Sequence, residues 1–152
     1  MRRRLALLIA LDQFPRSLWR DTPAAYAQDI KACRLCLEGI ENGHYAALGN
    51  MWEQQFYVIA ISHCEGPDHL SRMDLCQQLT RDAMATLPPE IAEMGAIAIE
   101  QGDRVRSIIE RFGRHPHRNA VLGRPSTPDE QAYIDAGDFP HQRKIETGPA
   151  SN

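Results

Sequence analysis

The densest group of chemically versatile side chains lies between residues 104 and 124. This stretch contains six arginines and two histidines, and its acidic neighbours are Asp103 and Glu110. Its centre, residues 111–119, has the sequence Arg-Phe-Gly-Arg-His-Pro-His-Arg-Asn. An arginine guanidinium is a planar fork that binds a phosphate or carboxylate through paired hydrogen bonds. The pattern predicts an anion-binding loop or, as an alternative, a solvated loop whose arginines pair with Asp12, Glu65 and other acids and hold the helices together.

A second candidate is the tripeptide His63-Cys64-Glu65, which follows an apolar helical segment. A helix C-terminus and a neighbouring carboxylate both favour a protonated imidazole, which suits a general acid or base. The alternative is that His63 is a packing residue whose ring is satisfied by hydrogen bonds. A His-x-Glu also begins the zinc deaminase signature, but the Pro-Cys-x-x-Cys that must follow is missing from the sequence, which argues against that class.

A third candidate is the hexapeptide Leu-Asp-Gln-Phe-Pro-Arg at residues 11–16, at the end of the most apolar segment of the chain. Burying Asp12 beside leucines is costly unless a cation or a hydrogen-bond donor pairs with it. Arg16 follows four residues later and is a suitable local partner on a helix. The sequence therefore predicts either a local Asp12–Arg16 pair or a pair that also contacts a ligand.

Together the three segments predict one polar pocket that binds a small anionic ligand, a phosphate or a carboxylate. Histidines and carboxylates would supply acid–base chemistry in a hydrolase-like enzyme, and arginines with amides would bind the ligand. The predicted catalytic residues are His63, Glu65, His117 and Asp12, and the predicted ligand-binding residues are Gln13, Arg16, Arg114, Arg118 and Asn119.

The competing hypothesis is a helical module that binds an acidic peptide without catalysis. In that case the arginines recognise the peptide and the histidines fix the loop. The sequence does not decide between an enzyme and such a module. A metal ion held by His63, Glu65, His117 and Asp12 is a third and weaker hypothesis, and neither a metal nor a cofactor is assigned.

Composition indicates a protein that folds as one domain. The chain has 152 residues, of which 43% are hydrophobic and 24% charged, enough to bury a sizeable core. The net charge of -3 argues against a general nucleic-acid-binding protein. The apolar run Leu5–Leu11 is too short for a membrane span and no signal-peptide cleavage site follows it, so we expect a cytoplasmic protein.

The four cysteines are expected to be reduced and buried. Cys33 and Cys36 form a Cys-x-x-Cys inside a predicted helix, whereas a redox pair needs a helix N-terminus after a strand. Cys64 and Cys76 do not repeat that spacing, as a structural zinc site would require. We therefore interpret all four as small core side chains in a reducing compartment.

Apolar periodicity predicts an all-α fold that positions these segments. Thr22 is expected to cap the second helix, with Ile30 facing inward, and Thr127 with Glu130 forms a capping box for the last one. The uniformly apolar first helix is expected to be enclosed on most sides. We expect a helical domain over residues 1–136, a mobile tail over 137–152, and helices over residues 5–11, 26–40, 51–63, 67–87, 90–112 and 128–136.

Four of these sequences resemble, in the same order, a bacterial family of unknown function with a tetratricopeptide-like helical fold. The resemblance covers about residues 5–136 and implies antiparallel helix pairs stacked in a right-handed tetratricopeptide-like array, but no activity. The matching segments are LDQFPR at 11–16, His63-x-Glu65, RFGRHPHRN at 111–119 and LGRPSTPDE at 122–130.

The chain departs from the family pattern at several points. Cys64 stands where the family has serine, His115 stands where it has phenylalanine, and a glutamine expected near Leu70 is absent. The family also has a further helical segment before the LDQFPR helix. We expect this chain to lack that segment, which would expose apolar surface of residues 5–11 and favour a homo-oligomer.

Overall fold

The structure is a computed structural model that describes residues 2–140, and this range contains α-helices and short 3-10 turns but no strand. The predicted all-α class is therefore confirmed for the described residues. Of the predicted tail, residues 141–152 lie outside them. The α-helices are α1 (Arg2–Leu18), α2 (Asp29–Glu41), α3 (Met51–His63), α4 (His69–Met84), α5 (Ala92–Phe112) and α6 (Pro128–Ala136), and the 3-10 turns are η1 (Pro23–Tyr26), η2 (Pro89–Ile91) and η3 (Pro116–Arg118).

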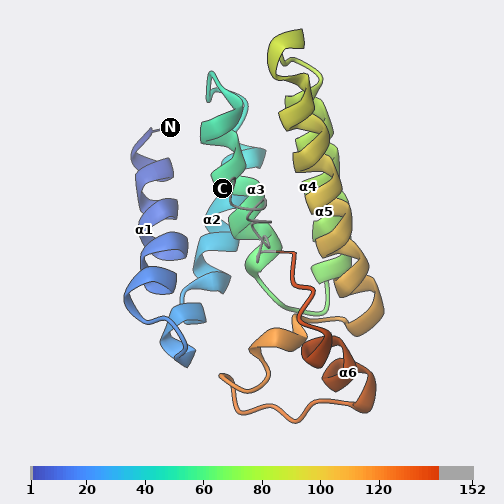
Figure 1. The fold of residues 1–152 in the computed structure, drawn as a ribbon. Coiled ribbons are helices and arrows are strands. Elements are labelled where there is room, and N and C mark those ends of the chain that lie inside the picture. Colours follow the sequence, from blue (N-terminus) through green and yellow to red (C-terminus); the bar gives the residue numbers. More distant parts are fainter. Residues whose placement is uncertain (1, 141–152) are drawn as a thin grey trace, which may run out of the picture.

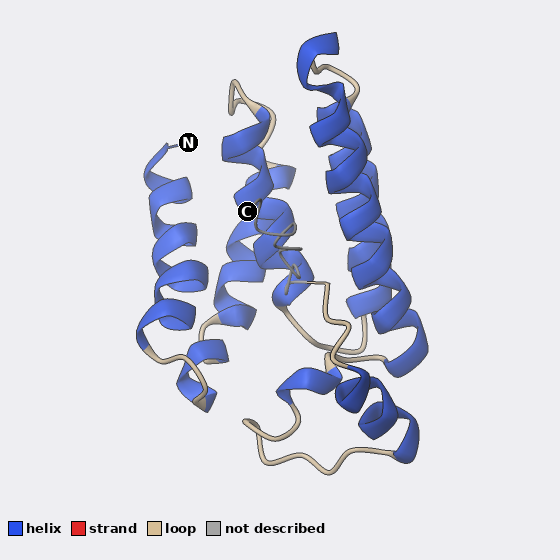
Figure 2. Cartoon of the chain, viewed as in Figure 1, coloured by secondary structure: helices blue, strands red, loops and turns tan. Residues whose placement is uncertain are grey.

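From α1 to α5, helices that follow one another in the chain are also neighbours in space. α1, α2 and α3 contact one another, α4 packs on α3, and α5 packs on α4. Figure 1 shows that successive helices run in opposite directions, while α6 and η3 lie together at one end of the molecule. Loops and short turns make all the connections (Figure 2). The tetratricopeptide-like right-handed array stays a prediction.

The main core lies where α1, α2 and α3 meet. Leu8, Cys36, Tyr57 and Ile61 are each 0% exposed there. A smaller apolar cluster lies at the C-terminal end of α4. There Met51, Ala83 and Met84 pack against residues of α5 that include Ala98 and Ile99. α3 packs against α1, α2 and α4, and this packing fixes the position of its C-terminal residues, which include His63.

The extent of α1 differs from the expected short segment. The helix continues through Pro15 to Leu18. In its last turn, the side chains of Arg16 and Ser17 donate to the carbonyl oxygens of Asp12 and Gln13. The whole hexapeptide of the sequence pattern is therefore helical, and Asp12 and Arg16 lie on one face, one turn apart.

The expectation that the first helix is enclosed on most sides is wrong. Only α2, α3 and η1 make extensive contacts with α1 within the described part of the chain. Leu5 and Leu8 are buried against them, whereas Leu7 is 45% exposed and Leu18 is 68% exposed. The homo-oligomer expected through this helix stays a prediction.

Local signals were correct at some helix ends and wrong at others. Thr127 and Glu130 form the predicted capping box. The second helix, however, begins at Asp29, because residues 23–26 form the separate turn η1, and Ile30 is 67% exposed rather than inward. The four cysteines are buried and free, as predicted.

We predict that Gly39→Ala destabilises the protein. A Cβ at residue 39 on α2 would lie 2.7 Å from Cε1 of Tyr57, whose ring is fully buried. The overpacking cost of about 1–3 kcal/mol exceeds the gain of up to about 1 kcal/mol that alanine brings to a helix interior. Urea unfolding measures the difference, with Gly49→Ala as control because no atom lies within 4 Å of its added Cβ. Equal or greater stability of Gly39→Ala would contradict the packing.

Candidate functional site

A cavity of about 710 Å³ lies between α3, α4 and α5, and residues from the end of α1, from η3 and from the segment after α6 also line it. Its volume is within the range of about 300–1,000 Å³ typical of small-molecule sites. Four of the predicted site residues line this cavity, namely Arg16, His63, His117 and Arg118.

His63 and Asp12 form a hydrogen-bonded pair where His63 lines the cavity. His63 Nδ1 lies 2.8 Å from Asp12 Oδ1, and Asp12 is only 2% exposed. The side-chain amide of Gln13 donates to the other carboxylate oxygen of Asp12. Because Asp12 occupies Nδ1, the second ring nitrogen, Nε2, is the one left for a molecule in the cavity.

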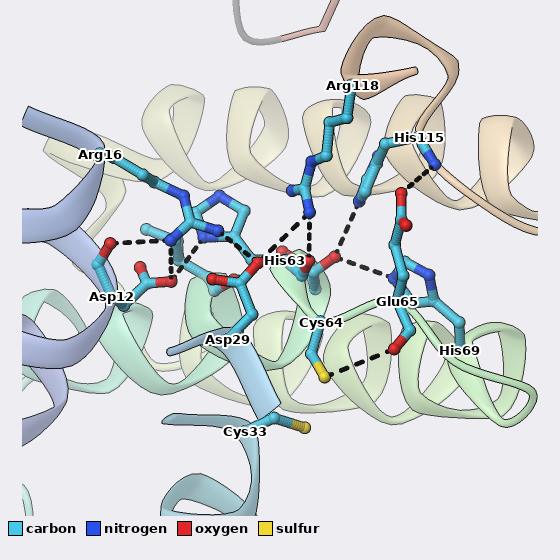
Figure 3. Close-up of polar contacts among 12 residues, drawn as sticks. Asp12, Arg16, Asp29, Cys33, His63, Cys64, Glu65, His69, His115 and Arg118 are labelled. Atoms are coloured by element: carbon cyan, nitrogen blue, oxygen red, sulfur yellow. Dashed lines mark hydrogen bonds and ion pairs between the residues drawn. The ribbon is translucent and has the colours of Figure 1, made fainter. Parts of the chain in front are cut away.

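Two arginines from distant parts of the chain meet at Asp29, in the first turn of α2. Arg16 Nη2 lies 2.8 Å from Asp29 Oδ2, and Arg118 Nη1 lies 3.3 Å from the same oxygen. Arg16 also contacts Asp12 at 3.0 Å, and Arg118 donates to the carbonyl oxygen of His63 over 2.8 Å. Figure 3 shows both guanidinium groups directed toward the Asp29 carboxylate. The ion pairs therefore join α1, α2, α3 and η3 at one point.

Arg118 keeps hydrogen-bonding capacity in reserve. Its side chain is buried, and both of its hydrogen bonds within the described residues leave from Nη1. Its Nε is buried without a partner there, as is Oδ1 of Asp29. The Tyr26 ring lies 4.6 Å from the guanidinium carbon, a cation–π contact that orients the fork.

Burial and charge shift the pKa values of the three central groups. Burial opposes ionisation of Asp12, but the hydrogen bond from His63 and the charge of Arg16 hold its pKa below the ordinary value. Burial lowers the pKa of His63 despite the Asp12 carboxylate, and burial raises the pKa of Asp29 despite its two arginines. At neutral pH the site therefore holds a neutral imidazole beside an ionised Asp12.

Glu65 does not line the cavity but belongs to a second polar cluster that builds the loop after α5. Its Oε1 accepts a 2.8 Å hydrogen bond from the backbone N–H of His115, and both of its oxygens bind Arg124. The Arg124 Nε in turn donates to Asn119 Oδ1 over 3.1 Å. These bonds hold the loop against the end of α3.

Arg114 and Asn119 also lie outside the cavity lining. The Arg114 fork binds both oxygens of Glu130, at 2.6 and 2.8 Å, and lowers the pKa of Glu130 to about 2. The Asn119 amide donates to Ser126 Oγ over 3.1 Å. The structure thus divides the predicted residues into four that line the cavity, a loop-holding group of Glu65, Arg114 and Asn119, and the pair Asp12 and Gln13, which contacts His63 through Asp12 without lining the cavity.

Three histidine rings lie together beside the cavity. His115 Nε2 and His69 Nε2 lie 3.2 and 2.9 Å from the carbonyl oxygen of Ser62. The His117 ring lies 5.4 Å from that of His115 and 5.6 Å from that of Phe139. Of the three, His115 and His117 line the cavity and His69 does not.

Comparison with known proteins places the chain in a family. A family model described as "Bacterial protein of unknown function (DUF924)" matches residues 1–138. The chain belongs to this DUF924 family. A solved structure of a protein of unknown function from Agrobacterium tumefaciens is 33% identical to this DUF924 chain, with a TM-score of 0.71, over 88% of this chain and 68% of the other. No curated protein matches it.

Several residues that line the cavity or support it were not predicted from the sequence. Asp29 was not singled out, although an acid in the first turn of a helix is a common signal for a stabilised helix N-terminus. Tyr26 lies at the start of the predicted helix 26–40, where an aromatic residue indicates a core position. Gln55 lies in a mostly apolar segment, and a single amide there has no spacing that would indicate a binding site. Arg124, which holds Glu65, is one of the arginines of residues 104–124, and its ion pair agrees with the alternative that these arginines pair with acids and hold the helices together.

The described residues of this DUF924 chain contain no group of three or more His, Cys, Asp or Glu side chains that could hold a metal ion. This finding contradicts the hypothesis of a metal ion held by His63, Glu65, His117 and Asp12. The oxygens of Glu65 are in addition already bound to Arg124 and to the backbone of His115. None of the described helices has the length and apolar character that crossing a membrane requires.

We predict that acid weakens this DUF924 protein partly through His115. Burial, with the nearby charge of Arg118, lowers the pKa of His115 well below its ordinary value. The unfolded chain binds this proton below about pH 6.5 and the folded chain does not, so stability falls as the pH drops below that value. At pH 5.5 the loss is about 1 kcal/mol. Urea unfolding of His115→Phe from pH 7.5 to 5.5 should give a flatter profile than the parent, and parallel profiles would contradict this assignment.

We also predict that Glu65→Gln affects stability rather than ligand binding. The amide can still accept the hydrogen bond from the His115 backbone but loses the ion pair with Arg124. The free energy of unfolding should fall by about 1–3 kcal/mol, while any affinity of the parent protein for phosphate, measured by calorimetry, stays unchanged. Loss of phosphate binding at unchanged stability would instead indicate that Glu65 contacts the ligand.

Proposed function

We propose that the chain binds a small carboxylate or phosphate ligand in the cavity, with the anionic group held at a charged end formed by Arg16, His63 and Arg118. The observation that carries this proposal is the convergence of two guanidiniums, from α1 and η3, on the lining of one cavity. Arginine forks suit planar carboxylate and phosphate oxygens.

The charged end has hydrogen-bond donors that no described residue accepts from, although its formal charges balance. Two arginines face two carboxylates, Asp12 and Asp29, so a ligand meets no large excess of positive charge. A guanidinium carries five N–H donors, and Arg118 uses only Nη1 within the described residues. The remaining donors of Arg118, with those of Arg16 on the cavity side, supply the hydrogen bonds to the anion.

The Asp12–His63 pair supports a hydrolase-like activity at the same place. Neutral His63 takes a proton from a water molecule while the water oxygen bonds to the phosphorus of a bound phosphate ester or to the carbonyl carbon of a carboxylic ester, whose alcohol or phenol is the leaving group. The bond to the leaving group then breaks, and the proton passes to that group. Asp12 orients the ring through Nδ1, and the arginines stabilise the negative charge that develops.

A peptide-binding module without catalysis is the alternative function. An acidic peptide needs an open groove, whereas this cavity is bounded by helices, by η3 and by the residues that follow α6. The volume of about 710 Å³, bounded on these sides, suits a small ligand better than an extended peptide. We also propose a cytoplasmic location, because four free, buried cysteines suit a reducing compartment.

Arginine substitution tests anion binding. Calorimetric titration with inorganic phosphate and with butyrate should show binding to the parent protein. Arg118→Lys and Arg16→Lys keep the charge but lose the fork, so affinity should fall about tenfold or more, in line with the 1.5–3 kcal/mol of a charged hydrogen bond. Arg104→Gln is the matched control, because Arg104 forms an exposed pair with Asp138 and does not line the cavity. Unchanged affinity in both lysine variants would overturn the proposal.

The pH profile of ester hydrolysis tests the general base. With p-nitrophenyl butyrate as substrate, the rate should rise as His63 loses its proton and level off near neutral pH. His63→Gln should remove this titration, while His44→Gln, a histidine bound to Arg4 away from the cavity, should not. Asp12→Asn should lower the rate and move the acid limb to lower pH, since the carboxylate favours the imidazolium. An unchanged profile in His63→Gln would contradict this role.

A further inference from the structure

The cavity changes character along the helices that enclose it. On α3, the lining residues His63, Ile59 and Gln55 follow one another at four-residue steps on one face of the helix. At 1.5 Å of rise per residue, the eight residues from His63 to Gln55 span about 12 Å. The cavity is therefore an elongated slot that extends from the charged end along α3.

The middle of this slot is apolar. One turn above His63, α3 contributes Val58 and Ile59, α4 contributes Met73 and Cys76, and α5 contributes Val105 and Ile108. Inorganic phosphate or a short carboxylate would occupy the charged end and leave this surface uncovered. Burying apolar ligand surface here is favourable by the same effect that drives folding.

The far end of the slot is polar again. It is formed by side chains that can hydrogen-bond, namely Gln55, Gln77, Thr80 and Gln101. The amides of Gln77 and Gln101 donate to Asp103 and to the carbonyl oxygen of Pro140. Nε2 of Gln55 is buried and has no partner among the described residues. A buried donor of this kind is costly unless a ligand or water accepts from it.

We infer that the ligand is an elongated amphiphilic acid, with a carboxylate or phosphate head, an apolar chain and a hydrogen-bond acceptor at the opposite end. The head lies at Arg16 and Arg118, the chain lies between α3, α4 and α5, and the acceptor meets Gln55. This assignment rests on the proposed anion site, and it adds the class of molecule that the site takes.

A series of ligands that differ only in length tests the inference. Calorimetric titration with acetate, butyrate, hexanoate and octanoate should show affinity rising by up to about fourfold for each added methylene, until the chain reaches Gln55. Octanoate and octyl phosphate compare the two head groups. 8-Hydroxyoctanoate should bind more tightly than octanoate, and Gln55→Leu should remove that preference.

A variant that fills the middle of the slot separates chain from head. Val105→Phe narrows the apolar section without touching the charged end, so octanoate binding should weaken at least tenfold while acetate binding stays the same. Ile97→Phe, on the exposed side of α5, is the matched control. Should Val105→Phe fail to fold, the length series on the unaltered protein still decides.

The outcomes distinguish the inference from the function on which it rests. Acetate or phosphate binding with no gain from chain length would overturn the amphiphilic ligand and leave the anion site standing. Absence of binding by every member of the series would overturn both.

Discussion

The shared carboxylate of Asp29 is the interaction on which the site depends. It is 5% exposed and binds Arg16 from α1 and Arg118 from η3 through one oxygen. A buried charge without a partner is strongly destabilising, so neither arginine can leave without cost. Three segments far apart in the sequence are therefore held at one place, and this place is the end of the cavity.

This constraint explains how a helical scaffold can position acid–base groups. α1 carries Asp12 and Arg16 one turn apart, and Asp12 then fixes the ring of His63 at the end of α3. The loop after α5 is held separately, through Glu65 and Arg124. One set of ionic bonds thus shapes the charged end of the slot, and another keeps its covering loop in place.

In the proposed complex, the slot and the charged end together would give a selectivity that neither gives alone. Guanidinium groups select for an anionic head, whereas the apolar middle favours a chain of suitable length. The neutral imidazole of His63 lies at the head and not along the chain. Chemistry would therefore occur next to the anionic group, with the chain serving to position the molecule.

The sequence predicted features whose cause is local. The capping box at Thr127 and the Asp12–Arg16 pair depend on residues three or four apart, and both are present. Contacts between residues far apart in the chain could not be predicted, because no sequence pattern indicates that Asp29 meets Arg118, 89 residues away. For the same reason Glu65 was read as catalytic, although its partner Arg124 lies 59 residues further along.

The most direct measurement of the central claim is the pKa of His63 from NMR titration of its imidazole, with and without saturating octanoate. An anion bound at Arg16 and Arg118 lies next to the ring and favours the imidazolium, so the account predicts that the ligand raises the pKa of His63. The imidazole resonances of His44, which is bound to Arg4 away from the cavity, should not respond to octanoate. A His63 pKa that is identical with and without bound octanoate would contradict the account.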